Sequence, residues 1–237
     1  MVFARFAFRL FLLVIAVAFG LALYHWGKGN PQDLPWTPLS LADRAGRFTN
    51  YKIAALRDDF LACRRLLDAG GEDYAVMAPV RGAGACGYAD GVRLSALAGF
   101  SYAPRAEIAC PVAIGLFLWE KQVVEPAALR HFGQKVARIE SFGSYACRAV
   151  RGGRAGRLSE HARANAIDIA AFRLSDGRRI GVAGDWTGEG KEAAFLREVR
   201  DGACAMFATV LSPDYNAAHR DHFHLDQAPR GGWSYCR

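Results

Sequence analysis

Residues 159–172 read Ser-Glu-His-Ala-Arg-Ala-Asn-Ala-Ile-Asp-Ile-Ala-Ala-Phe, and residues 219–226 read His-Arg-Asp-His-Phe-His-Leu-Asp. Together the two stretches hold four of the six histidines of the chain. Zinc in an enzyme usually takes three ligands from His, Asp or Glu and keeps another position for water. His161, Asp168 and His224 can supply such a set, so these stretches predict a catalytic zinc site.

Other polar residues near His224 are candidates for the remaining roles of a hydrolytic site. A general base must lie within hydrogen-bond reach of the proton that it removes. His222 and Asp221 precede His224 closely, and we favour His222 with Asp221 as the alternative. His219 is then available to bind substrate or to stabilise an oxyanion. A lone histidine is more often a surface or core residue, but a cluster of four favours a functional site.

Several motifs resemble known zinc peptidases. Residues 159–169 resemble the Ser-x-His-x4-Ala-x-Asp segment of the D-Ala-D-Ala carboxypeptidases, and the spacing of His219, His222 and His224 is similar to that of the penicillin-insensitive murein endopeptidases. More extensively, the stretch from about Leu39 to Cys236 resembles the bacterial extensin-like C-terminal domain family. That resemblance rests on residues 143–148 (Gly-Ser-Tyr-Ala-Cys-Arg), 159–161, 213–216 (Pro-Asp-Tyr-Asn) and 219–226.

The resemblance to zinc peptidases of the lysostaphin, D-Ala-D-Ala metallopeptidase and hedgehog type implies roles for individual residues. It implies that His161, Asp168 and His224 bind Zn²⁺. It also places Arg148 where the carboxypeptidases have an arginine that holds substrate or stabilises its oxyanion, although two residues separate Tyr145 from Arg148 here.

The function implied is zinc-dependent hydrolysis of the peptide stems or cross-links of peptidoglycan, as a D,D- or L,D-endopeptidase or a carboxypeptidase. The alternative is a non-catalytic wall-binding or scaffold domain that retains the fold. The enzyme is favoured because the chain has candidates for a base and for substrate binding in addition to the three ligands, namely His222, Asp221, His219 and Arg148. A structural zinc site closes with four ligands and needs no base. A regulatory protein partner is compatible with either function.

The N-terminus has the composition of a membrane-targeting segment. Residues 10–24 are uncharged and almost entirely apolar, with Arg5 and Arg9 before them. Because no Ala-x-Ala cleavage site follows, we favour a signal anchor in residues 1–26 over a cleaved signal peptide. The anchor would lie in the inner membrane and the domain in the periplasm; the alternative is secretion after cleavage. Residues 27–40 contain three prolines and predict an extended linker.

The six cysteines agree with an oxidising compartment, because an even number in an exported domain is typical of disulfides. We expect three disulfides. The sequence does not determine the pairing, and our preferred pairs are Cys147 with Cys204 and Cys86 with Cys110, because each pair brackets one stretch of the domain.

Residues 41–237 are predicted to form one α+β domain, in which helices flank a small antiparallel sheet that carries the zinc site. Hydrophobic periodicity predicts helices over 50–69 and 190–211 and a strand over 136–142. Residues 126–132 are predicted to form a helix with Pro126 in its first turn. The apolar run 166–172 is a second predicted strand, and the turn at residues 176–177 suggests 179–182 as its hairpin partner. Residues 111–120 fit either a helix or a strand. Residues 71–105 are treated as a loop. Alternation over 222–226 predicts a short strand with His222 and His224 on one face.

The net charge of +7 does not by itself indicate a nucleic-acid-binding protein. The charged residues are scattered along the chain, and no nucleic-acid-binding motif is present. We therefore expect no nucleic-acid partner. A polyanionic cell wall or an anionic membrane surface is a more accessible partner for an exported basic domain, and a solvated surface with no partner is the simplest alternative.

Overall fold

A mixed nine-stranded sheet organises the domain in the computed structural model, which describes residues 2–150 and 157–237. The strand order is β1-β4-β5-β6-β7-β10-β9-β11, and β8 also pairs with β7. A separate hairpin joins β2 (Val80–Arg81) and β3 (Gly87–Tyr88). The strands of the large sheet are β1 (Tyr74–Val76), β4 (Gly91–Leu97), β5 (Phe100–Ala109), β6 (Val136–Gly143), β7 (Ala166–Leu174), β8 (Arg179–Gly181), β9 (Thr209–Leu211), β10 (Phe223–Asp226) and β11 (Tyr235–Cys236).

The α+β class is confirmed, but the prediction of a small antiparallel sheet is wrong. β5 pairs with β6 in parallel, and β9 pairs with β11 in parallel. A parallel pair needs a crossover connection, usually a helix. Here α4 (Cys110–Trp119) and α5 (Glu125–Phe132) lie between β5 and β6 in the chain. The sheet is also larger than expected because residues 71–105, treated as a loop, contribute β1, β4 and part of β5.

The ambiguous segment 111–120 is a helix. Every residue of α4 is buried, which explains why its sequence shows no polar face and why periodicity could not identify it. The Trp119 ring packs at 5.8 Å from that of Phe172 on β7, and its Nε1 donates to the Val199 carbonyl at 2.7 Å. A π-helical turn, Glu120–Val124, connects α4 to α5, whose Pro126 lies in the first turn as predicted.

The other helices are shorter than predicted. The expected helix over 50–69 is broken at Asp59, whose side chain caps α3 (Phe60–Gly70) after α2 (Thr49–Ala55). The expected helix over 190–211 ends at Ala203, because residues 209–211 form β9 beside β10. α7 (Lys191–Ala203) and the four-residue α6 (Val182–Asp185) complete the α-helices of the domain within the described residues.

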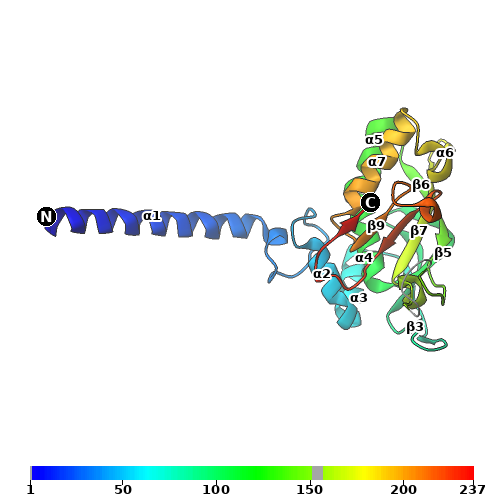
Figure 1. The fold of residues 1–237 in the computed structure, drawn as a ribbon, viewed down its shortest axis with the longest axis horizontal. Coiled ribbons are helices and arrows are strands. Elements are labelled where there is room, and N and C mark those ends of the chain that lie inside the picture. The colour runs from blue at the N-terminus through cyan, green and yellow to red at the C-terminus, as the bar shows by residue number, and fades with distance from the viewer. Residues whose placement is uncertain (1, 151–156) are drawn as a thin grey trace.

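The N-terminal helix α1 (Val2–Gly29) projects from the domain as a straight rod (Figure 1). It is long and apolar enough to cross a membrane, and none of its apolar window is buried by the domain. The segment after it lies against the domain, since Lys52 Nζ on α2 donates to the carbonyl of Pro31 and to Thr37 Oγ1, both at 2.8 Å. The predicted linker is therefore attached to α2 at Pro31 and Thr37.

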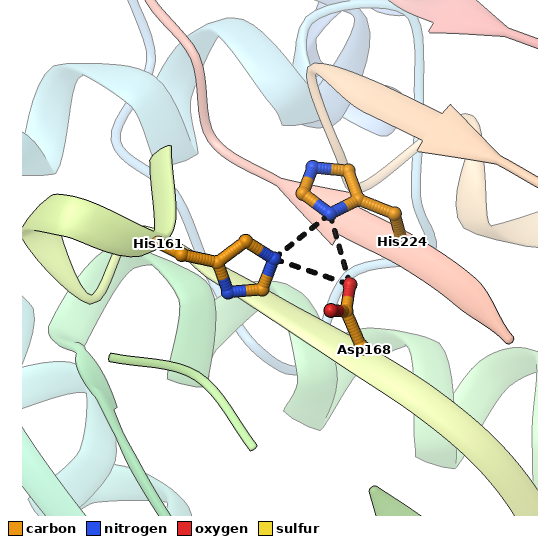
Figure 2. A group of neighbouring side chains, drawn as sticks. All are labelled: His161, Asp168 and His224. Carbon is orange, nitrogen blue, oxygen red and sulfur yellow. Dashed lines mark hydrogen bonds and ion pairs between the residues drawn. The ribbon is translucent and has the colours of Figure 1, made fainter. Parts of the chain in front are cut away.

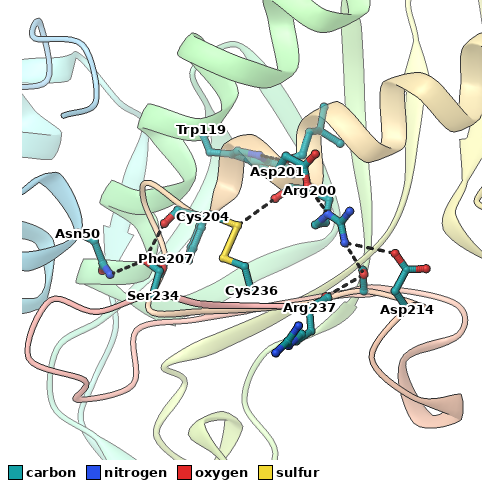
Figure 3. Close-up of a disulfide and its surroundings, with 12 residues drawn as sticks. Asn50, Trp119, Arg200, Asp201, Cys204, Phe207, Asp214, Ser234, Cys236 and Arg237 are labelled. Carbon is teal, nitrogen blue, oxygen red and sulfur yellow. Dashed lines mark hydrogen bonds and ion pairs between the residues drawn. A yellow bond between two sulfur atoms is a disulfide. The ribbon is translucent and has the colours of Figure 1, made fainter. Parts of the chain in front are cut away.

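Three disulfides are present, as expected, but both preferred pairings are wrong. Cys63 on α3 bonds to Cys110 at the start of α4, because these two helices pack together. The other pairs are Cys86–Cys147 and Cys204–Cys236. Figure 3 shows the last of these joining the end of α7 to the C-terminal strand β11, with Ser234 bonded to the backbone nearby. Which cysteines form each disulfide therefore depends on the packing of elements that are distant in sequence.

Candidate metal centre

Asp168 and His224 are direct cross-strand neighbours in the sheet. The antiparallel register of β7 and β10 sets His224 opposite Asp168, Phe223 opposite Ile169 and Leu225 opposite Ile167. Because successive side chains of a strand point to opposite faces, the Asp168–His224 pair and the two apolar pairs lie on different faces. The apolar pairs belong to the buried core. The core therefore fixes the two polar side chains on the other face.

His161 reaches this face from a tight turn just before β7. The 3-10 turn Glu160–Arg163 is followed by Ala164 in the left-handed region, at φ 53°, and the chain then enters β7. The Asn165 side chain ties the turn to its surroundings by donating to Glu160 Oε2 at 2.7 Å and to the Gln227 carbonyl at 2.9 Å. This reversal of the chain explains how residues separated as His-x6-Asp come together.

The three predicted ligands form one cluster (Figure 2). His161 Nε2 lies 3.2 Å from Asp168 Oδ1 and 3.1 Å from His224 Nδ1, and His224 Nδ1 lies 3.0 Å from Asp168 Oδ1. All three side chains are nearly buried.

The donor set fits a zinc ion. His161 Nδ1 donates to the Ser144 carbonyl at 2.5 Å, which directs Nε2 at the cluster. Among the described residues, no lysine or arginine pairs with Asp168; its ion-pair partners are imidazoles. Two imidazole nitrogens and one carboxylate oxygen within 4.8 Å of one another match the ligand types that zinc prefers.

Asp226 is a second carboxylate at the cluster that sequence reasoning missed as a site residue. Its Oδ2 lies 3.0 Å from His224 Nε2, and its Oδ1 accepts from the Ala228 amide at 2.9 Å. It therefore orients His224 with Nδ1 facing the other ligands. The signal was present in the sequence, because residues i and i+2 of a strand share a face.

The charges of the cluster follow from these contacts. Burial alone would raise the pKa of Asp168, but hydrogen bonds from His161 and His224 outweigh burial and hold that pKa well below its usual range. Burial would lower the pKa of His224, but Asp168 and Asp226 outweigh it and raise the pKa to about 9. The structure thus gathers negative charge around the imidazoles, which favours a cation at this position.

His222 and Asp221 form a pair beside the cluster. His222 Nδ1 lies 2.9 Å from Asp221 Oδ1, and His222 Nε2 lies 3.6 Å from Asp168 Oδ1. The Asp221 carboxylate therefore accepts from Nδ1–H, and Nε2 faces the predicted ligands. The ring of Phe142 packs edge-on against His222 with centroids 5.7 Å apart, which helps to fix the imidazole plane.

His219 lies at the same place, with its ring centroid 5.2 Å from His222 and 6.0 Å from His224. Its Nδ1 is 2.8 Å from Asn216 Oδ1, an oxygen that also accepts from the Ala218 amide. His219 therefore donates from Nδ1, and its Nε2 is an acceptor. Burial, followed by the neighbouring His222 and His224, lowers the pKa of His219 to about 4, so it is neutral at neutral pH.

A hollow of about 410 Å³ lies over the cluster. We call it the metal-side hollow; its lining includes Arg148 and the four clustered histidines, together with Asp168 and Asp226. The structure thus brings Arg148 to the same hollow as the predicted ligands. Asp221 does not line this hollow, but it is hydrogen-bonded to His222, which does.

The fold and the site together define an α+β domain with a buried His-Asp-His cluster at the base of a hollow. The chain belongs to the family described as Extensin-like protein C-terminus, whose model matches residues 61–237. The match begins within α3 and includes all the candidate site residues. Neither the curated proteins nor the solved structures gave a significant match to the chain.

Proposed function

We propose that the protein is a zinc-dependent peptidase that hydrolyses peptide stems or cross-links of peptidoglycan in the cell envelope. The observation that carries the proposal is the His161, Asp168 and His224 cluster at the base of a hollow that His222 also lines. The similarity of residues 159–169 to the D-Ala-D-Ala carboxypeptidase segment supports the reaction class. The apolar helix α1 supports an envelope location, as a membrane anchor or a signal sequence.

His161, Asp168 and His224 would hold the metal ion through Nε2, one carboxylate oxygen and Nδ1, respectively. A zinc ion held by three protein ligands supplies Lewis-acid polarisation of a peptide carbonyl and acidifies a water molecule. In the zinc-bound protein, Asp226 would accept from Nε2–H of His224 and leave Nδ1 unprotonated for the metal, and the Ser144 carbonyl would do the same for Nε2 of His161 by accepting from Nδ1–H.

His222 is the general base in this proposal. Its Nε2 takes a proton from the attacking water and later passes the proton to the leaving amine. Asp221 accepts from Nδ1–H, which fixes the tautomer with Nε2 unprotonated and stabilises the imidazolium that forms. The two residues are therefore partners rather than alternative bases, because the carboxylate reaches the site only through the imidazole.

Arg148 and His219 act on the substrate. Arg148 lines the metal-side hollow, and its positively charged guanidinium group could stabilise the oxyanion. His219 cannot serve the oxyanion in the same way, because its Nδ1–H is engaged by Asn216 and its Nε2 is an acceptor. We assign it to accept an N–H group of the substrate peptide.

The test is digestion of purified, cross-linked peptidoglycan by the full-length protein in detergent micelles, with and without a chelator. Mass spectrometry of the products identifies the bond. Chelator-sensitive release of defined muropeptides is expected, with activity lost in His222→Gln and retained in His131→Gln. His131 is the matched control because it pairs with Glu198, outside the site. Intact peptidoglycan with zinc bound to the protein would reject the enzyme and favour a wall-binding domain.

A further inference from the structure

We infer that a second hollow, beside the metal centre, binds a free carboxylate of an acidic peptide through Arg157, Arg163 and Arg230. The inference rests on the proposed function and specifies its substrate class: a peptide with a carboxylate outside the bond that is cut. The arginines lie outside the set of residues assigned to the chemical step.

The second hollow adjoins the first. It has a volume of about 440 Å³, and we call it the arginine hollow. Arg157, Glu160 and Arg230 line both hollows, with Leu158 and Ala228, so they form the shared wall. A peptide lying over the metal ligands can therefore extend into the arginine hollow without leaving the surface.

The arginine hollow is electropositive. Its lining contains Arg157, Arg163 and Arg230, against Glu160 as the only carboxylate among the described lining residues. Glu160 Oε2 already accepts from the Asn165 side chain at 2.7 Å. Within residues 2–150 and 157–237, none of the three arginines forms an ion pair, whereas Arg173 and Arg179 at the sheet both pair with Glu140. Three arginines thus line one hollow, and none has an ion-pair partner among the described residues.

Arg230 is held in position for this role. Its Nε donates to Thr209 Oγ1 at 3.0 Å, and its guanidinium lies 5.4 Å from the centroid of the Tyr235 ring. These two contacts engage Nε and one face of the guanidinium plane. Tyr235 in turn belongs to β11, which the Cys204–Cys236 disulfide ties to the end of α7. Arg230 is exposed to solvent, but these contacts hold it against the sheet.

The ligand chemistry follows from the guanidinium group. Arginine forms two parallel hydrogen bonds with a carboxylate, and the planar fork of donors matches a carboxylate better than it matches a neutral amide. A terminal or side-chain carboxylate of a peptide, placed beyond the bond over the metal centre, is the group that the hollow fits. Charged hydrogen bonds of this kind contribute enough to change affinity by about 10-fold or more.

The test is calorimetric binding to the full-length, zinc-loaded protein in detergent micelles. The probes are a synthetic peptidoglycan stem pentapeptide with free carboxylates and the same peptide with its carboxylates converted to carboxamides. The free acid should bind at least about 10-fold more tightly than the amide. Arg230→Gln and Arg157→Gln should each weaken binding of the acid but leave binding of the amide unchanged, and Arg230→Lys should restore part of the loss.

Arg105→Gln is the matched control, because it removes one exposed positive charge that lines neither hollow. Retained zinc affinity shows that each variant is folded. Equal binding of the two peptides, the absence of binding by either at millimolar concentration, or an equal effect of Arg105→Gln would overturn the inference. Arginine-dependent binding of the acid without chelator-sensitive hydrolysis would instead reject the peptidase and leave the carboxylate site in place.

Discussion

The Asp226 carboxylate lies 3.0 Å from His224 Nε2, on the side of the imidazole opposite the other predicted ligands. An outer carboxylate of this kind fixes the orientation and tautomer of a ligating histidine and raises its basicity. We predict that Asp226→Asn lowers zinc affinity about 10- to 100-fold while the fold is retained. Competition with a chromophoric chelator measures the affinity, and an unchanged affinity would contradict the role of Asp226.

Asp221→Asn should have a different effect, although Asp221 also bonds to a histidine. Its partner, His222, is the proposed base and not a ligand. We therefore expect unchanged zinc affinity and a fall in turnover of about 10-fold or more, because the asparagine no longer holds the base in its productive tautomer. Comparison of kcat with zinc affinity in Asp221→Asn and Asp226→Asn separates the two roles. Loss of zinc from Asp221→Asn would place Asp221 among the metal-binding groups.

The ligands themselves should be necessary for metal binding. His161→Ala and Asp168→Ala each remove one of the three ligand atoms, so both should abolish tight zinc binding and hydrolysis. Metal content after dialysis is the measurement, and His131→Ala is the control because His131 pairs with Glu198. A full equivalent of zinc in both ligand variants would refute the assignment.

Glu120 should make stability depend on pH. It is fully buried; Tyr102 donates to Oε1, and Oε2 has no partner among the described residues. Burial raises the pKa of Glu120 well above its usual value. The folded state therefore retains a proton that the unfolded chain releases above a pH of about 4.5, so this contribution to stability is lost as the pH rises toward the folded pKa.

Glu120→Gln removes that titration. At pH 8 we expect it to raise the free energy of unfolding by about 1–3 kcal/mol, because an amide replaces a buried carboxyl group that must either take up a proton on folding or bear an uncompensated charge. Near pH 4 the difference from wild type should shrink. Urea unfolding at the two pH values is the measurement. The exposed Glu189→Gln provides the control, and an identical pH slope in wild type and Glu120→Gln would reject the effect.

The Cys204–Cys236 disulfide should stabilise both the fold and the wall of the arginine hollow. It closes a loop with a sequence separation of 32 residues, and β11 carries Tyr235 against Arg230. Replacing both cysteines with alanine should lower the free energy of unfolding by about 2–4 kcal/mol. It should also weaken binding of the acidic peptide more than binding of zinc, since the metal ligands lie on other elements. Equal losses of both affinities would show general unfolding instead.

Local signals in the sequence identified several elements correctly. Alternation predicted β6 and β10, the apolar run predicted β7, and Pro126 marked the first turn of α5. These signals succeed because they depend on neighbouring residues in one element. The same signals failed for α4, which is buried on all sides and therefore has no polar face to give it a helical period. They also failed at residues 204–211, because the helix ends at Ala203 and residues 209–211 pair with β10 as β9.

The sequence by itself determined the α+β class, the apolar N-terminal segment, the number of disulfides and which residue types could form a metal centre. All of these depend on composition or on short spacing. The tertiary structure decided the mixed sheet, the disulfide partners, the position of Asp226 beside His224 and the adjacency of the two hollows. These depend on strand register and on the packing of distant segments. Short-range periodicity does not specify which segments pair, because burial across the whole domain selects the partners.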